Sequence, residues 1–337
     1  MVIRSGTGFI AAAFLILCGC TDLTEFDHTL KAGLHIMYSP DLSVVNTIED
    51  ISGARALCVI PDCFLVTTTE GTVIRFDLES HQQTGCFTIG SPSPSGYFEI
   101  EYSPSESSVY IIGALGQILE FHVPDMEFMN SFSVCETPVD IEIAVGEYYF
   151  YVAGATSSTI YEIHLWNDFA SRQCVLLSSP TCMAIDQGQD TILVGTLAEP
   201  MVVSTGTTSM NRSALSHFPY LQAIETIPNI SNETRLFAVF GNPNYSMQIA
   251  TILYYFPPEF YDSCWVGTAP IVGDIHYICT DGYGDYAYVL SYIGDNKSRL
   301  ICYNCSEYTI EDQVDLEGFP LDLEISSGGT LLVLTAE

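Results

Sequence analysis

Alternating apolar and polar residues recur along this chain in units of roughly 40 to 50 residues. Each unit opens with a short segment whose alternation is typical of a β-strand, and helix-type periodicity is almost absent. The opening segments start at residues 54, 97, 138, 180, 219, 270 and 320, with the sequences ARALCV, YFEIEY, PVDIEI, PTCMAI, PYLQAI, PIVGDI and PLDLEI. A repeat of this length indicates a solenoid or a propeller.

Three further strands follow the opening strand in most units. A turn rich in Gly, Ser, Asp or Pro leads to a strongly apolar segment, such as SVYIIG (108–113) or TILVGT (191–196). A third segment follows, such as TVIRFDL (72–78), and then a fourth of more variable sequence. Four short antiparallel strands in each unit are typical of a β-propeller blade.

The last unit ends halfway through this pattern. Residues 319–337, FPLDLEISSGGTLLVLTAE, contain only two strands, whereas LHIMYS (34–39) and SVVNTIE (43–49) have no unit of their own. Combining the two pairs gives a complete blade and removes the free sheet edges of an open array. The sequence therefore predicts an all-β, seven-bladed propeller over residues 34–337, with its last blade completed by the N-terminal strands.

The repeats resemble those of the YVTN-type propellers, a group of secreted or periplasmic proteins with a quinoprotein amine dehydrogenase-like or WD40-like fold. The resemblance rests on the opening proline, the apolar second strand and a third strand that ends in Asp, as in TVIRFDLES (72–80). The tryptophan-docking repeats of quinoprotein dehydrogenases are absent, since Trp166 and Trp265 are the only tryptophans. The resemblance implies an extracytoplasmic propeller and carries over no catalytic residue.

The N-terminus has the pattern of an export signal. Arg4 precedes the apolar run GFIAAAFLIL (8–17), which is too short to span a bilayer comfortably. The sequence LCGC at 17–20 resembles a bacterial lipobox. This resemblance implies a signal peptide over residues 1–19, lipidation of Cys20 and a polar tether over residues 20–33. The alternative is an ordinary secretory signal with an incidental cysteine.

The predicted location follows from this signal. We expect a lipid-anchored protein of the cell envelope, on the periplasmic side of a membrane or at the cell surface. Thr21 follows the lipidated cysteine, and by resemblance to the enterobacterial sorting rule it favours the outer membrane.

The composition limits the partners. The chain has 337 residues, with 41 acidic against 9 basic residues and a formal net charge of −32. Nucleic acid is therefore excluded as a partner, because few cations are present to neutralise phosphates. We expect a monomer that binds the membrane through its anchor and binds a protein or small-molecule ligand.

Acidic residues recur on the opening strands, which line the central channel of a propeller. Residues two apart on a strand share a face, so these side chains are expected to form two layers at equivalent heights in neighbouring blades. Carboxylates converging in a channel would raise one another's pKa or bind a divalent cation such as calcium. The other interpretation is that they face channel water or accept hydrogen bonds from backbone amides. The residues are Glu99, Glu101, Asp140, Glu142, Asp274, Asp322 and Glu324. In the fourth and fifth units, Ala184 and Ala223 are expected to take the place of the carboxylate in the deeper layer.

Cysteines and aromatic residues supply two further candidate features. Local disulfides are possible in an exported chain, between Cys58 and Cys63 and between Cys302 and Cys305. The segment YYFPPEFYDSCW (254–265) either buries its rings between blades or forms an aromatic rim for a sugar, peptide or protein. The candidate rim residues are Tyr254, Tyr255, Phe256, Phe260, Tyr261 and Trp265.

The functional expectation is a non-catalytic one. No nucleophile elbow, phosphate loop or zinc-protease signature is present. We therefore expect a lipid-anchored module for binding or scaffolding rather than an enzyme. The alternative is a cation-dependent hydrolase or lyase, similar to propeller lactonases, with its site in the acidic channel.

Overall fold

A computed structural model shows the architecture of this chain. It describes the chain from residue 31 to residue 336, apart from loop segments and single residues. The described ranges are 31–90, 97–113, 116–123, 125–134, 138–144, 149–165, 171–186, 191–196, 198, 200–205, 209–214, 221–227, 233–240, 247–255, 263–281 and 283–336. Within these ranges no helix has the length and hydrophobicity needed to cross a bilayer.

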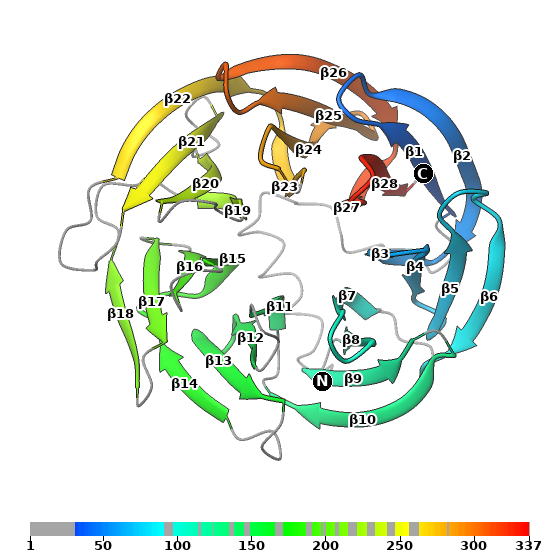
Figure 1. Ribbon diagram of the computed structural model, residues 1–337, viewed down its shortest axis with the longest axis horizontal. Helices are drawn as coiled ribbons and strands as arrows, with labels where there is room; N and C mark the ends of the chain where they lie inside the picture. Colours follow the sequence, from blue (N-terminus) through cyan, green and yellow to red (C-terminus); the bar gives the residue numbers. More distant parts are fainter. Residues whose placement is uncertain are drawn as a thin grey trace, which may run out of the picture.

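The described strands form seven four-stranded antiparallel sheets arranged around a central axis (Figure 1). Blades 1 to 3 are built from consecutive strands. Blade 1 contains β3 (Ala54–Ile60), β4 (Cys63–Thr68), β5 (Thr72–Asp77) and β6 (Gln83–Thr88). Blade 2 contains β7 (Tyr97–Ser103), β8 (Ser108–Gly113), β9 (Gln117–His122) and β10 (Glu127–Ser133). Blade 3 contains β11 (Pro138–Ile143), β12 (Tyr149–Gly154), β13 (Thr159–His164) and β14 (Ser171–Val175).

Blades 4 to 6 repeat the same order. Blade 4 contains β15 (Pro180–Asp186), β16 (Thr191–Thr196), β17 (Met201–Thr205) and β18 (Met210–Ala214). Blade 5 contains β19 (Leu221–Ile227), β20 (Glu233–Phe240), β21 (Met247–Tyr255) and β22 (Ser263–Ile271). Blade 6 contains β23 (Asp274–Thr280), β24 (Tyr286–Gly294), β25 (Lys297–Asn304) and β26 (Thr309–Glu317).

Blade 7 joins the two ends of the described chain. Its strand order is β2-β1-β28-β27, with β1 (Lys31–Tyr38) and β2 (Ser43–Ser52) from the N-terminal end and β27 (Phe319–Ile325) and β28 (Thr330–Ala336) from the C-terminal end. β1 and β28 pair antiparallel over their whole length, from Ala32 opposite Ala336 to Tyr38 opposite Thr330. The predicted seven-bladed propeller, closed by N-terminal strands, is confirmed.

The first strands of the blades surround the axis. β3, β7, β11, β15, β19, β23 and β27 each contact the next in order, and β27 contacts β3 again, so the ring is closed. Second strands are the most buried, because blades cover both of their faces. All six residues of β8 and of β16 are buried, which explains their continuous apolar sequences.

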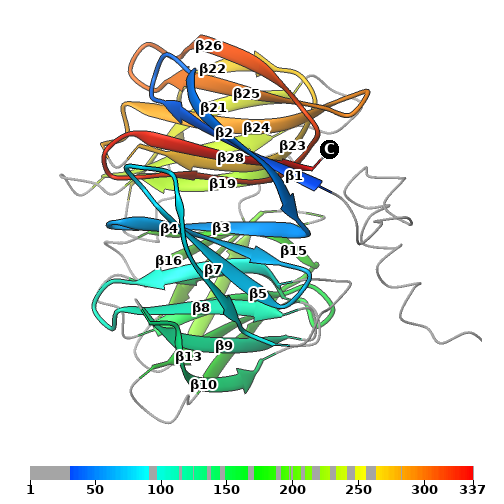
Figure 2. The same ribbon diagram turned by 90° about the vertical axis from the view of Figure 1, so that its right-hand side faces the viewer.

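Hydrogen bonds between turns repeat on the two faces of the ring. On one face, the residue after the fourth strand donates its N–H to the turn between the second and third strands, as Ile89 does to Gly71, Val134 to Gly116 and Leu176 to Ser158. We call this the N-terminal face, because Lys31 and Ala336 lie on it (Figure 2).

The opposite face has its own repeated bond. Here the residue that follows the third strand donates to the turn between the first and second strands. The donors and acceptors are Leu78 to Asp62, Val123 to Ser107, Cys305 to Asp285 and Ser39 to Gly329. We call this the opposite face. The repetition shows that the blades are equivalent in orientation.

The hydrophobic core lies between blades rather than at the axis. Between blades 6 and 7, Leu290, Leu331 and Val333 are completely buried and pack with Met37 from β1. Burial of each such side chain contributes about 1.5–3 kcal/mol relative to exposure. The N-terminal strands are therefore part of a core that the rest of blade 7 needs.

Candidate functional site

Strand register sorts the channel side chains into two layers. In blades 2 to 7, the pairing of the first and second strands is irregular near the start of the first strand. The residue just after each irregularity belongs to an upper layer, nearer the N-terminal face. This layer consists of Glu99, Asp140, Cys182, Ala223, Tyr277 and Asp322.

The lower layer lies two residues further along each strand. It consists of Glu101, Glu142, Ala184, Glu225, Cys279 and Glu324. Cys58 of blade 1 lies near this layer, since burial and then the charges of Glu101 and Glu324 raise the pKa of its thiol. The structure therefore brings together six of the seven acidic residues expected from the sequence and adds Glu225.

Two expectations about these layers were wrong. Asp274 opens β23 three residues before Tyr277, opposite Tyr292, and so lies outside both layers. In blade 5 the lower position holds Glu225 and not Ala223, which lies in the upper layer. The error arose because the sequence repeat was aligned on Pro219 and Pro270, whereas the pairing in these two blades starts further along the chain.

Burial in the channel raises the pKa of the carboxyl groups. The pKa of Asp140 and of Asp322 rises to about 7, and that of Glu101 to about 8, chiefly through loss of water. Hydrogen bonds from backbone amides limit the rise for the two aspartates. The pKa of the other acids also rises well above its usual value, through burial and then through the charges of neighbouring carboxylates; these are Glu99, Glu142 and Glu324.

The two upper-layer aspartates bind the backbone of the next blade. Asp322 Oδ2 accepts a hydrogen bond from the Leu57 N–H at 2.6 Å, which joins blade 7 to blade 1. Asp140 Oδ2 accepts the equivalent bond from the Met183 N–H at 2.6 Å, which joins blade 3 to blade 4. These aspartates are therefore structural acceptors, as one of the two sequence-based interpretations expected.

A small group of other polar side chains borders the upper layer. Burial lowers the pKa of Arg55, which lies close enough to Tyr277 for their charges to interact. Burial also lowers the pKa of His276 to about 4, so this imidazole is neutral at pH 7. Its Nε2 is buried without a hydrogen-bond partner, and its ring packs edge-on against Phe319 at 4.8 Å between centroids.

Metal binding finds no support in this geometry. Among the side chains that the structure describes, no group of three or more His, Cys, Asp or Glu is arranged to hold a metal ion. Asp322 already accepts backbone N–H bonds at both oxygens, from Leu57 and from Leu323, and Asp140 Oδ2 accepts one from Met183. The acidic layers bring together partly buried carboxyl groups whose negative charges repel one another.

The two expected disulfides are absent, and all four cysteines are free thiols. Ile60, not Cys58, lies directly opposite Cys63, so the two cysteines are diagonal neighbours. Diagonal positions are too far apart for the Cβ spacing of a disulfide. Cys302 packs between blades 6 and 7, whereas Cys305 packs between blades 5 and 6, so their thiols point to different faces of one sheet.

The expected aromatic rim is placed only in part. Tyr254 and Tyr255 end β21, and Trp265 lies in β22 opposite Ile252. Phe256, Phe260 and Tyr261 lie outside the described residues. Cys20, the expected lipidation site, also lies outside them.

Exposed apolar residues mark the opposite face, which the sequence repeat did not single out. Tyr283, in the turn between β23 and β24, is 83% exposed, and Tyr38, at the end of β1, is 55% exposed. Both lie on this face in neighbouring blades 6 and 7. Phe128, near the start of the outer strand β10 of blade 2, is 55% exposed. Exposed rings at turns are a signal of a binding surface.

The closed ring of seven four-stranded blades defines the class of this protein as a seven-bladed β-propeller. No protein-family model matches the chain, and no curated protein matches its sequence. Solved structures do resemble it. The β-propeller domain of Cps50 (Swd1) from Myceliophteria thermophila has a TM-score of 0.67 at 10% identity, covering 90% of this chain and 100% of that domain.

Two bacterial structures show the same similarity. Kuenenia stuttgartiensis hydrazine synthase has a TM-score of 0.64 at 12% identity, covering 82% of this chain and 90% of the other. A functionally unknown protein from Desulfotomaculum acetoxidans has a TM-score of 0.67 at 10% identity, covering 85% and 95% of the two chains. At such low identity these neighbours show a shared fold and no shared function.

Proposed function

We propose that this protein is a lipid-anchored, extracytoplasmic propeller that binds a protein or small ligand on its opposite face. The observation that carries the binding proposal is the exposure of Tyr38 and Tyr283 in neighbouring blades. Large rings on exposed turns supply binding area with few rotatable bonds to restrain. The neighbouring blades hold these turns on a rigid frame.

Sequence supports the anchor and the location. The lipobox-like LCGC at 17–20 makes Cys20 the acylated residue, and Thr21 favours the outer membrane. β1 begins at Lys31, so 11 residue steps separate the anchor from the first strand (31 − 20). The YVTN-type repeat pattern supports the same extracytoplasmic setting.

The second candidate is a cation-dependent hydrolase or lyase in the channel. Convergence of Glu101, Glu142, Glu225 and Glu324 is the observation in its favour. Against it, the upper aspartates act as backbone acceptors, and the described channel residues form no metal-binding group. We therefore place the function on the opposite face rather than at the axis.

The test uses full-length protein in cells with a photo-crosslinking amino acid in place of Tyr283. We expect the protein in the membrane fraction and a discrete crosslinked product at position 283. The matched control replaces Glu70, an exposed residue in a turn of the N-terminal face, and should give no such product. In the Cys20→Ala variant the folded propeller should move to the soluble fraction.

Two results would contradict the proposal. Retention of the Cys20→Ala variant in membranes after a high-salt wash would contradict the proposed lipid anchor. The absence of any crosslinked product from both position 283 and position 38, with the protein folded, would contradict the proposed binding face.

A further inference from the structure

The described chain starts on one particular face of the propeller. Lys31 opens β1 opposite Ser52, and Ala32 lies opposite Ala336, so both ends of the described part of the chain lie on the N-terminal face (Figure 2). β1 then runs away from this face and reaches Tyr38 on the other side of the ring. A tether that starts at Cys20 therefore joins the N-terminal face.

The length of that tether restricts how the propeller stands on a bilayer. Eleven residue steps reach at most about 40 Å when fully extended. β28 crosses the ring with seven residues, or about 23 Å. If the opposite face lay on the membrane, crossing this depth would use more than half of the greatest reach of these eleven steps.

The charged residues also differ between the two faces. On the N-terminal face Lys31 lies 2.6 Å from Asp50, and Lys297 lies 3.3 Å from Glu317, so two of its acids are paired with lysines. Glu70 and Asp295 also lie in turns of this face. On the opposite face the described turns contain no Lys or Arg. Their acidic residues, together with those that flank them, are Asp41, Asp62, Asp77, Glu79, Glu106, Asp125, Glu127, Asp281, Asp285 and Glu307.

Local hydrogen bonds keep several of these carboxylates ionised. Asp41 accepts from Ser43, Asp77 from Ser80 and Asp125 from His122, and these bonds lower the pKa of the three aspartates. The opposite face is thus negatively charged and is repelled by anionic headgroups. The acids that flank its exposed rings make it a poor surface for burial in lipid.

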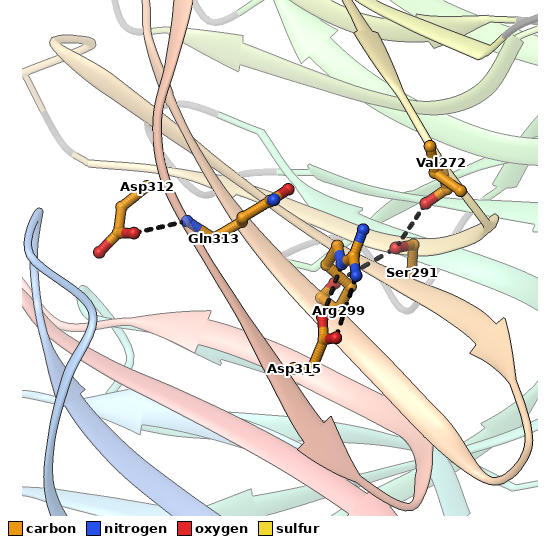
Figure 3. A network of polar contacts seen from close by, with 6 residues as sticks. All are labelled: Val272, Ser291, Arg299, Asp312, Gln313 and Asp315. Atoms are coloured by element: carbon orange, nitrogen blue, oxygen red, sulfur yellow. Dashed lines mark hydrogen bonds and ion pairs between the residues drawn. The ribbon is translucent and has the colours of Figure 1, made fainter.

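The N-terminal face also exposes apolar residues in connections between blades. Leu177, between β14 and β15, is 71% exposed, and Val272, between β22 and β23, is 65% exposed. The buried Ser291 hydroxyl shares its one hydrogen between the Val272 carbonyl, at 3.1 Å, and the Arg299 carbonyl, at 3.3 Å (Figure 3). This bond holds the connection in place while the valine side chain stays in solvent.

The underlying sheet is fixed by a further contact. Arg299 makes two hydrogen bonds to the Asp315 carboxylate, at 2.6 and 3.0 Å (Figure 3). Gly273, directly after Val272, has a φ of +109°, and a Cβ there would lie 2.6 Å from the Tyr292 carbonyl. The exposed position of Val272 therefore belongs to a rigid connection.

We infer that the N-terminal face lies against the lipid surface that holds the anchor, with Leu177 and Val272 at the headgroup region. This inference rests on the proposed lipid anchor and adds an orientation to it. The opposite face, with Tyr38 and Tyr283, then points away from the bilayer toward its ligand.

The experiment measures contact with lipid at single tryptophans. Full-length acylated protein is reconstituted into phosphatidylcholine and phosphatidylglycerol vesicles, with or without a lipid that carries a quencher near its headgroup. The variants are Leu177→Trp and Val272→Trp, with Tyr283→Trp as the matched control at an exposed position on the other face. The background fluorescence comes from Trp166 and Trp265 and is measured on the unsubstituted protein.

We expect the added fluorescence of Leu177→Trp and Val272→Trp to lose most of its intensity when the quencher is present, and that of Tyr283→Trp to stay unchanged. Quenching at position 283 alone would overturn the orientation while leaving the anchor intact, and so would quenching at none of the three positions. If the unsubstituted protein does not float with vesicles, the anchor and the orientation are both overturned.

Discussion

Single carboxyl groups in the channel have two opposing effects on stability. Asp322 provides an acceptor for the Leu57 N–H, which would otherwise be buried without a partner. It also adds negative charge beside Glu99 and Glu324. Because its pKa is about 7, mild acid removes the charge and leaves the hydrogen bond.

Because pH separates the effect of the Asp322 charge from that of its hydrogen bond, the bond can be tested at pH 5, where the carboxyl group is protonated. Asp322→Ala should lower the free energy of unfolding by about 1–3 kcal/mol, the cost of a buried amide without an acceptor. Asp322→Asn, which keeps one carbonyl oxygen for the Leu57 N–H but sets its NH2 group against the Leu323 N–H, should lose less stability than Asp322→Ala. Urea denaturation measures both. Equal losses in the two variants would show that the bond to Leu57 has no energetic role.

Most of the acidic residues in the channel could be predicted from the sequence alone. The alternation in PVDIEI and PLDLEI correctly placed two carboxyl groups of each strand on one face. It could not place Glu225 or Asp274, because a proline marks the start of a repeat in sequence while hydrogen bonding decides where a strand starts. The cysteine pairs failed for a related reason: closeness in sequence does not show which face of a sheet a thiol occupies.

At the scale of elements, two connections between blades consist of a single glycine, Gly53 and Gly318. Only Gly318 separates β26 from β27, and its N–H donates to the Asn296 carbonyl at 2.7 Å. Its φ is +99°, a conformation that strongly favours glycine. A Cβ at this position would lie 2.5 Å from the Ala336 carbonyl.

Substitution of Gly318 should therefore be costly. Gly294 is a matched control, because its φ of +91° is similar and nothing lies within 4 Å of a Cβ there. Gly294→Ala should cost about 1–2 kcal/mol for the backbone conformation alone. Gly318→Ala should lower the thermal midpoint clearly further, since blade 7 must also shift away from the new methyl group. Indistinguishable midpoints for the two variants would refute the close approach at Ala336.

The strand order of blade 7 could be predicted from the sequence, because two N-terminal strands without a unit of their own complete the two-stranded unit at the C-terminal end. The hydrogen bonds between turns were not readable. Their donors, such as Leu78 and Val123, are ordinary apolar residues whose backbone amides act regardless of side-chain type. The exposure of Tyr283 was equally hidden, because Tyr is also a common core residue.

At the scale of the whole molecule, the channel makes stability depend on pH. Its acids have a raised pKa in the folded state, so between pH 4 and pH 8 the folded protein holds more protons than the unfolded chain. Stability then falls as pH rises, by about 1.4 kcal/mol per pH unit for each extra proton held. Their contribution is fully present below about pH 4 and is lost through pH 7–8.

We therefore expect the urea midpoint to decrease steadily from pH 5 to pH 8. The double variant Glu101→Gln, Glu142→Gln removes two of these acids and should flatten the decrease while raising the midpoint at pH 8. A midpoint that stays constant or increases over this range would show that the carboxyl groups are well hydrated in the folded protein.

Closure of blade 7 also sets an order of events during synthesis. His35 and Thr335 are neighbours in the finished sheet but 300 residues apart in the chain. At about 5–20 residues per second, the ribosome needs on the order of 15 to 60 seconds to make the segment between them. Throughout that time Leu34 and Ile36, both fully buried at the end, have no sheet to enter. The first strand made is thus among the last to find its neighbour in the sheet, because β28 is the last strand made.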